Sequence, residues 1–215
     1  MKSFKFLLFL LCLFLVSASA ASAHFSYSPQ RHITSTHSSD VKEYFCVDAT
    51  DSNVPISTVD AYKAVKEVLY SKNYDGLANN KIYFIQGGAG ETACKNMTSE
   101  QLSSTPFRYY IQDSTKPLCD GTSSCVVRYG EVKQSDGHSH YDYGVATLRY
   151  KTFTNVRDYI VNHETGHLLG LPDGNGSNDC PGSIMHSKDY GCSNGYPSDP
   201  TQKDLDAVTT EANSN

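Results

Sequence analysis

Two histidines four residues apart, His163 and His167, enclose Glu164 in the run His-Glu-Thr-Gly-His. On a helix, residues at this spacing lie on one face about one turn apart, so both imidazoles can reach one metal ion. Zn²⁺ favours imidazole and carboxylate ligands and activates water when one coordination position stays open. A carboxylate beside the first histidine can then accept a proton from that water and pass it to a leaving amine. The run therefore predicts a catalytic zinc site with Glu164 as general base and then general acid.

A catalytic zinc ion takes about three ligands from the protein, and the residues after this run offer a third. Gly170 stands three residues after His167, and Asp173 three residues after Gly170. Because a glycine can adopt the left-handed conformation that turns a chain sharply, Asp173 can return beneath the metal. We expect His163, His167 and Asp173 to bind one Zn²⁺. His186 is the rival third ligand, and a helix with solvated histidines is the alternative to a metal site.

The motif His-Glu-x-x-His-x-x-Gly-x-x-Asp resembles that of the metzincin clan of zinc peptidases, whose long motif usually ends in His where this chain has Asp173. A motif that ends in Asp at this position is similar to that of the snapalysin family, which are small secreted bacterial peptidases with Asp as the third ligand. Residues 159–197 are also similar to a group of secreted metzincin-like bacterial proteins. That match comprises Tyr-Ile-Val-Asn-His-Glu-Thr-Gly-His-Leu-Leu-Gly, a later Cys, a Met segment, then Gly-Cys and a Pro, and it covers about a fifth of the chain.

The resemblance implies a Met-turn beneath the metal, for which residues 183–186 (Ser-Ile-Met-His) are the candidate. Met185 would form a soft apolar floor under the ligands, and an ordinary core methionine is the alternative. Several metzincins carry a Tyr two residues after this Met, but this chain has Ser187 there, so that role is not transferred. Tyr190 and Tyr196 are candidates for assisting an oxyanion, although each is more often a packed or exposed side chain.

The surrounding sequence predicts an α+β fold. Apolar runs between turn residues predict strands at 43–49, 81–86, 107–112, 125–129 and 144–150, and helical periodicity predicts helices at 57–71, 155–170 and 201–212. We expect one buried face on the first of these helices, formed by Val59, Tyr62, Val65, Val68 and Leu69. The resemblance implies a two-lobed metzincin-like zincin domain, with a twisted mixed sheet, an active-site helix packed on it, a Met-turn and a C-terminal helix.

Residues 134–140 are polar and predict an exposed turn between two strands. His138 and His140 lie in this segment. An accessory metal site or a substrate contact is possible for them, but a solvated turn is the expected structure.

The N-terminal residues are typical of a cleavable signal peptide. Lys2 and Lys5 accompany an apolar run at residues 6–16, and residues 17–23 are all Ser or Ala. The apolar run is too short to span a bilayer comfortably, which disfavours a membrane anchor. We therefore expect a signal peptide at 1–23, an irregular N-terminal arm at 24–42, a metallopeptidase domain at 43–215, and a secreted protein.

Six of the seven cysteines follow the predicted signal peptide. An even number in an exported chain predicts disulfides, because the secretory route is oxidising. Six cysteines allow fifteen pairings. No Cys-x-x-Cys spacing, which would suggest a cysteine zinc site, is present in the sequence. Closeness in sequence favours two pairs and leaves a third: Cys119–Cys125, Cys180–Cys192 and then Cys46–Cys94.

The formal net charge is −5, and loss of residues 1–23 would remove two Lys and no acid, which gives −7. An acidic chain without a Lys/Arg cluster disfavours nucleic-acid and anionic-membrane partners. Acidic loops permit calcium, but no dedicated calcium-loop motif is present in the sequence. Asn96 and Asn175 begin Asn-x-Thr and Asn-x-Ser triplets, which are glycosylation acceptors in a eukaryotic host.

Together these features predict a secreted, monomeric zinc endopeptidase that hydrolyses peptide or protein substrates with a metal-activated water. The peptide is expected to bind extended along an edge strand. One alternative is a secreted non-catalytic zinc-containing binding protein with a metalloprotease-like fold, which has no need of Glu164 as a base. The others are a zinc-free, disulfide-held surface or matrix protein, and a zinc hydrolase acting on a different bond.

Overall fold

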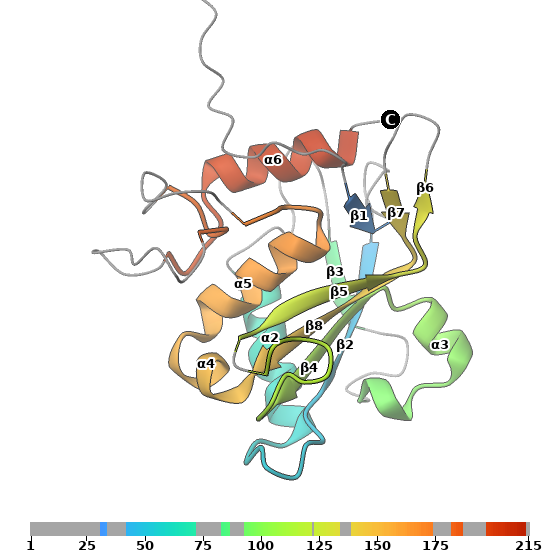
Figure 1. The fold of residues 1–215 in the computed structure, drawn as a ribbon, viewed down its shortest axis with the longest axis vertical. Helices are drawn as coiled ribbons and strands as arrows, with labels where there is room; N and C mark the ends of the chain where they lie inside the picture. The colour runs from blue at the N-terminus through green and yellow to red at the C-terminus, as the bar shows by residue number, and fades with distance from the viewer. Residues whose placement is uncertain are drawn as a thin grey trace, which may run out of the picture.

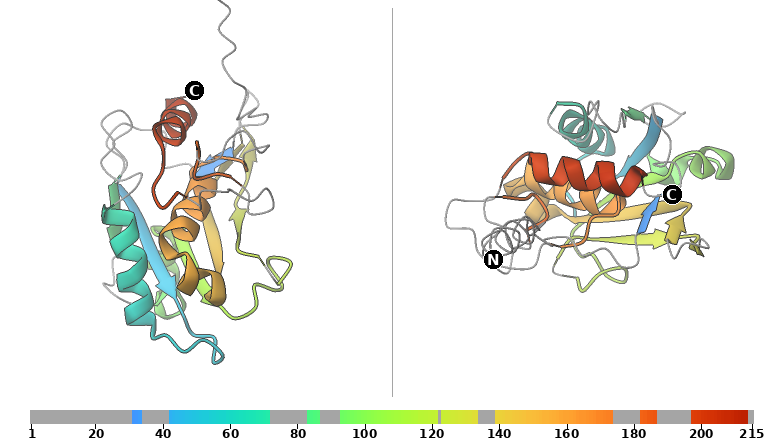
Figure 2. Two further views of the ribbon diagram at one scale, coloured as in Figure 1. Left: turned by 90° about the vertical axis from the view of Figure 1, so that its left-hand side faces the viewer. Right: turned by 90° about the horizontal axis from the view of Figure 1, so that it is seen from above.

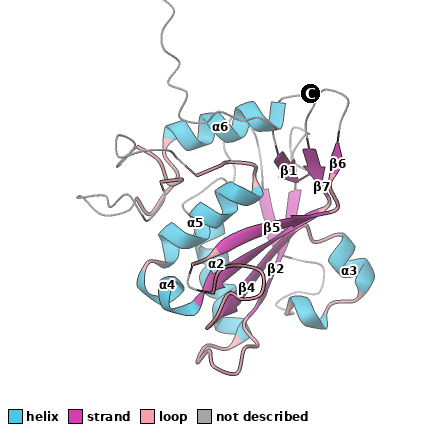
Figure 3. Cartoon of the chain, viewed as in Figure 1, coloured by secondary structure: helices cyan, strands magenta, loops and turns pink. Residues whose placement is uncertain are grey.

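The computed structural model describes residues 31–33, 42–71, 83–86, 93–121, 123–133, 139–173, 182–186 and 197–213. These residues form an α+β fold in which the long helices α2 and α5 pack against one face of a mixed β-sheet (Figure 1, Figure 3). In this part of the chain no helix is both long and apolar enough to cross a membrane. The signal peptide and several candidate residues lie outside the described residues: 1–23, His138, Asn175, Cys180, Ser187, Tyr190, Cys192 and Tyr196.

The main sheet has five strands in the order β3-β2-β4-β8-β5. The four strands β3, β2, β4 and β8 run parallel to one another. The fifth strand, β5, is antiparallel to β8 and forms one edge of the sheet. The predicted mixed sheet and its five strands are therefore confirmed. Their bounds are β2 Lys42–Asp48, β3 Tyr83–Gln86, β4 Phe107–Gln112, β5 Cys125–Tyr129 and β8 Tyr143–Arg149.

The first long helix, α2, spans Thr58–Ser71 and begins at the predicted cap. The Ser57 hydroxyl accepts a hydrogen bond from the Asp60 N–H at 3.1 Å and donates one to its carboxylate at 2.7 Å. The prediction that Val59 belongs to the buried face is wrong, since it is 41% exposed. At 100° per residue Val59 lies about 120° from the centre of the face at Val65, whereas the fully buried Ala61 lies about 40° away.

The helix predicted at 155–170 is confirmed as α5 Arg157–Leu168, and a short helix that was not predicted, α4 Tyr150–Asn155, precedes it. Val156 separates them with φ −141° and ψ 51°, outside the helical region. The predicted strand at 144–150 accordingly ends one residue early, because Tyr150 begins α4. A final helix, α6 Gln202–Asn213, confirms the prediction for the C-terminal region.

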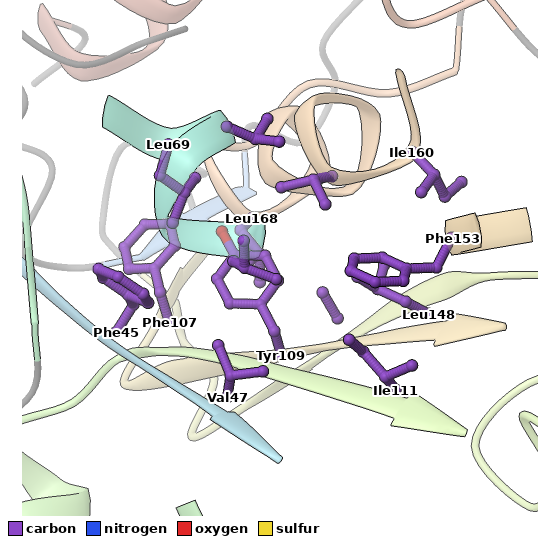
Figure 4. Packing of buried hydrophobic residues seen from close by; sticks show 14 of the residues in the cluster. Phe45, Val47, Leu69, Phe107, Tyr109, Ile111, Leu148, Phe153, Ile160 and Leu168 are labelled. Carbon is purple, nitrogen blue, oxygen red and sulfur yellow. The ribbon is translucent and has the colours of Figure 1, made fainter. Parts of the chain in front are cut away.

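The core lies between the sheet and the helices (Figure 4). Along β4 the buried positions alternate, so Phe107, Tyr109 and Ile111 all point to the helix-covered face. α2 packs on β2, α5 packs on β8, and the two helices contact each other (Figure 2). The helix α5 therefore rests on the apolar core between helices and sheet, as the sequence predicted.

The opposite face of β2 is joined to the short η2 Cys94–Asn96 and α3 Ser99–Ser103 through a second apolar cluster around Met97. Cys46 and Cys94 lie in this cluster with their sulfurs 2.09 Å apart, and the sulfurs of Cys119 and Cys125 are 1.95 Å apart. Both distances are compatible with disulfide bonds and agree with the pairing that closeness in sequence favoured. The third predicted pair lies outside the described residues.

A separate three-stranded sheet has the order β1-β7-β6, from β1 Arg31–Ile33, β7 Ser139–Tyr141 and β6 Val132–Lys133. It corrects two predictions. Part of the 24–42 arm is a strand, and His140, expected in an exposed turn, pairs in register with His32 and Val132. These strands are too short for a periodic signal, and backbone pairing with a distant segment defines them.

Candidate metal centre

The helix α5 carries three of the predicted site residues: His163, Glu164 and His167. The four-residue spacing places the two imidazoles on one face, with ring centroids 4.7 Å apart and planes at 89°. Their Nε2 atoms approach to 3.1 Å. His163 and Glu164 are buried, at 7% and 2% exposure. The helix thus points two nitrogen donors at one position.

Gly170 supplies the turn that the sequence predicted after this helix. Its φ is 102°, and hydrogen bonds from its N–H to the His167 carbonyl and from Leu171 N–H to the Gly166 carbonyl close the helix end. The chain then reverses and brings Asp173 back to the histidines. The Oδ1 atom of Asp173 lies 3.4 Å from Nε2 of both His163 and His167.

Among the described residues, His163, His167 and Asp173 form a group whose ligand atoms all lie within 4.8 Å of one another. Two ligands bonded to one tetrahedral zinc at about 2.1 Å stand about 3.4 Å apart. The observed separations of 3.1, 3.4 and 3.4 Å are close to that value. The donor set and its spacing therefore fit a zinc ion held by three protein ligands, with room for a fourth ligand.

The other ring nitrogen of each histidine is held by the backbone. Nδ1 of His163 donates to the Ile184 carbonyl at 2.9 Å, and Nδ1 of His167 donates to the Leu171 carbonyl at 2.7 Å. A carbonyl can only accept, so each neutral imidazole carries its proton on Nδ1 and presents the Nε2 lone pair to the site. This second layer of hydrogen bonds is the arrangement that metal-ligating histidines use.

Glu164 stands beside the three ligands as a buried carboxylate. Its Oε2 has no hydrogen-bond partner in the part of the chain that the structure describes. Burial raises the pKa of the Glu164 carboxyl, and the charges of His163 and His167 only partly oppose that rise. A buried carboxylate oxygen without a partner is costly to stability, so its presence here favours a chemical role.

Opposing effects set the pKa values of two of the ligands. Burial alone would raise the pKa of Asp173, but the neighbouring His163 and His167 outweigh this effect and leave the pKa below its usual value. Burial alone would lower the pKa of His163, but Asp173, Glu164 and the Ile184 carbonyl raise it above the usual value.

A cavity of about 850 Å³ opens onto these residues. His163, Glu164, His167 and Asp173 form one part of its wall, and Val126 on β5 forms another. Because β5 is an edge strand, its outer side has no neighbouring strand of the main sheet. The cavity is large enough for several residues of an extended chain.

Residues 182–186, which include the predicted Met-turn, pass beneath His163. Met185 is fully buried in the main core, and the carbonyl of the preceding Ile184 is the one that holds His163. His186 is buried, but it is not part of the convergent group among the described residues, whereas Asp173 is. The hydroxyl of Tyr159 donates to the His186 carbonyl at 2.6 Å and ties this segment to α5.

Two residues at the site have no sequence signal. Arg128 on β5 donates a hydrogen bond to the His167 carbonyl, and Asp204 on α6 accepts hydrogen bonds from Ser183 and Ile184. Arg128 is 39 residues from His167, and Asp204 is 20 residues from Ile184. No short motif links positions so far apart.

One predicted glycosylation acceptor can be located. Asn96 is exposed at the end of η2, which leaves its side chain accessible. Its modification stays a prediction.

No protein-family model matches this chain, and no curated protein matches it. The class of the protein therefore rests on the α+β fold and on the His163/His167/Asp173 group themselves.

Proposed function

We propose that this chain is a secreted zinc-dependent endopeptidase of the metzincin type. One observation carries the proposal: three ligand atoms converge at the spacing of a tetrahedral zinc site, and the buried Glu164 faces the same cavity. A purely structural metal site has no need of a buried carboxylate without a partner. Two sulfur pairs at bonding distance and the N-terminal sequence support an oxidising, extracellular location.

Each residue has a distinct part in the proposed reaction. His163, His167 and Asp173 hold the metal, and the carbonyls of Ile184 and Leu171 keep the imidazoles in the correct tautomer. When bound, zinc supplies a positive charge that polarises the peptide carbonyl and lowers the pKa of water to about 7. Glu164 Oε2 accepts a proton from the attacking water and delivers it to the leaving amide nitrogen. Burial raises the pKa of Glu164 above its usual value, which strengthens this carboxylate as a base toward the water.

The edge strand β5 supports extended binding of the substrate. A peptide lying along β5 would add a strand to the main sheet, and its backbone would pass the cavity that contains Glu164. Main-chain hydrogen bonds would then position the scissile bond with little dependence on side chains.

The central test compares purified mature protein with Glu164→Gln on a broad peptide library, with zinc content measured for both. We expect the parent alone to cleave, with a rate loss of at least about 10³-fold in the variant, and about one zinc in each. Glu100→Gln, which changes an exposed acid on α3, is the matched control and should cleave like the parent. Bound zinc without cleavage by the parent would favour the non-catalytic binding protein.

A second test addresses the ligands directly. Zinc should raise the Tm of the parent protein from which metal has been removed with a chelator. At a free zinc concentration 100 times Kd, zinc binding should stabilise the folded state by about 2.7 kcal/mol. Asp173→Ala should lose most of this rise, whereas Asp199→Ala, at an exposed position, should keep it. If zinc shifts the Tm of neither the parent nor either variant, the metal assignment is wrong and a zinc-free protein is favoured.

A further inference from the structure

One part of the cavity wall at the candidate metal centre is a short stretch of chain where the edge strand β5 begins. Residues 123–125, which we call the loop wall, line the cavity together with Val126, so four consecutive residues follow it. Most of the other lining residues belong to α4 and α5, and Glu164 is among them. A peptide that pairs with β5 and continues past the first residue of this strand would therefore run along the loop wall.

A pair of cysteines closes the chain around the loop wall. Cys125 is the first residue of β5, and its sulfur lies at bonding distance from that of Cys119, six residues earlier in the chain. A bond that joins residues so close in sequence confines the backbone between them. Because Cys125 itself lines the cavity, this bond acts directly on the wall.

Hydrogen bonds hold the loop wall from both sides. The hydroxyl of the buried Thr115 donates to the Ser123 carbonyl at 2.7 Å and accepts the Gly121 N–H at 3.2 Å. On the other side, the hydroxyl of Ser124 accepts the N–H of Arg149 at the end of β8, at 3.0 Å. The wall is therefore fixed before a peptide arrives, and a fixed surface loses little conformational entropy on binding.

We propose that the loop wall binds the substrate and that the Cys119–Cys125 bond, by holding it in place, sets the affinity for the peptide. This inference rests on the proposed peptidase function and gives the cysteine pair a role in substrate binding besides its contribution to stability. The two cysteines act through the backbone that they join, so they are positioning residues, and the chemistry stays with Glu164 and the metal ligands. Loss of the bond should therefore raise KM and leave kcat unchanged.

The double variant Cys119→Ala/Cys125→Ala tests the proposal on peptides long enough to extend past the start of β5. We expect KM to rise about tenfold, with kcat within about twofold of the parent value and zinc affinity unchanged. Thr115→Val keeps both cysteines and removes the hydroxyl that holds Ser123, so it should raise KM in the same direction even if the cysteine variant folds poorly.

Thr98→Ala is the control for a general loss of stability. It removes the capping box of α3, which packs on the opposite face of the main sheet from α5, so it should lower Tm and leave KM unchanged. Parental KM in both the cysteine variant and Thr115→Val would overturn the inference. A fall in kcat or zinc affinity that parallels the rise in KM would also overturn it, because the loop would then act on the metal centre.

A binding measurement separates failure of this inference from failure of the proposed function. Zinc-loaded Glu164→Gln, with and without the two Cys→Ala changes, is titrated with a fluorescent peptide, and loss of the cysteines should weaken binding about tenfold. Equal binding by the two proteins would overturn the inference alone, as would peptide mapping that finds Cys119 and Cys125 as free thiols in the parent. A parent that neither cleaves nor binds any peptide would overturn the peptidase proposal and this inference with it.

Discussion

The buried carboxylate of Asp204, on α6, accepts a hydrogen bond from the hydroxyl of Ser183, twenty-one residues earlier. The same carboxylate accepts the Ile184 N–H at 2.9 Å and the Thr201 N–H at 2.8 Å. Because the Ile184 carbonyl holds His163, the last helix is connected to the candidate metal centre through a single residue, Ile184.

Replacing Asp204 with Ala should therefore affect both folding and metal binding. Several buried donors would lose their acceptor, so we expect the free energy of unfolding to fall by about 3 kcal/mol in urea titrations. Zinc affinity of the folded variant should fall by about tenfold or more, because His163 loses its orientation. Asp206→Ala, at an exposed position on the same helix, is the control and should change neither quantity appreciably. An Asp204→Ala protein with parental zinc affinity would contradict the positioning role.

Gly170 should tolerate Asn better than Ala. Its φ of 102° is outside the range that side chains readily adopt, and Asn enters the left-handed region more easily than Ala. We expect Gly170→Ala to lose about 1–2 kcal/mol of stability and to bind zinc more weakly, since the turn delivers Asp173. Thermal unfolding and zinc titration of both variants measure whether Asn at this position costs less stability and zinc affinity than Ala. Equal effects of Ala and Asn would show that the conformation of this residue is unimportant.

The two cysteine pairs should contribute unequally to stability. Cys46 and Cys94 are 48 residues apart, whereas Cys119 and Cys125 are six apart. The chain entropy lost from the unfolded state grows with loop length, so removal of the first pair should cost about 4 kcal/mol and removal of the second about 2 kcal/mol. Urea unfolding of the two double Cys→Ala variants checks this order. A reversed order would argue against a loop-entropy origin.

Asp51 should contribute stability that depends on pH. The N–H groups of Asn53 and Asp113 donate to its carboxylate at 2.9 and 3.0 Å, which holds the pKa of Asp51 below its usual value of 3.8. A depressed pKa in the folded state stabilises the protein above pH 3.8, and this contribution is lost as pH falls through the folded value. Asp51→Ala should therefore lower Tm at pH 7, and the difference from the parent should shrink towards pH 3. A Tm difference that stays constant or widens on acidification would disprove this linkage.

The sequence was most informative where a local rule applies. Helical spacing placed His163 and His167 on one face, and the glycine at 170 predicted the reversal that returns Asp173. The apolar run at 107–112 likewise predicted the bounds of β4. These features depend on neighbours within a few residues, so their physical cause is present in the local chain.

Local rules failed where distant segments decide the outcome. Arg31–Ile33 becomes a strand only because β7 pairs with it, and no local pattern predicted the short helix α4 that precedes α5. The order β3-β2-β4-β8-β5 is also invisible to periodicity, since any of the strands presents the same backbone groups to a neighbour.

The sequence by itself determined the types and spacing of the groups in the candidate centre, because helix geometry and a left-handed glycine act over a few residues. Only the tertiary structure decided that Asp204 supports the turn beneath His163, and that Arg128, Arg149 and Lys151 share a cavity with Glu164. These relationships join residues on different strands and helices. They exist because burial of one common apolar core brings those elements together, and the free energy of that burial belongs to the whole fold and to no single segment.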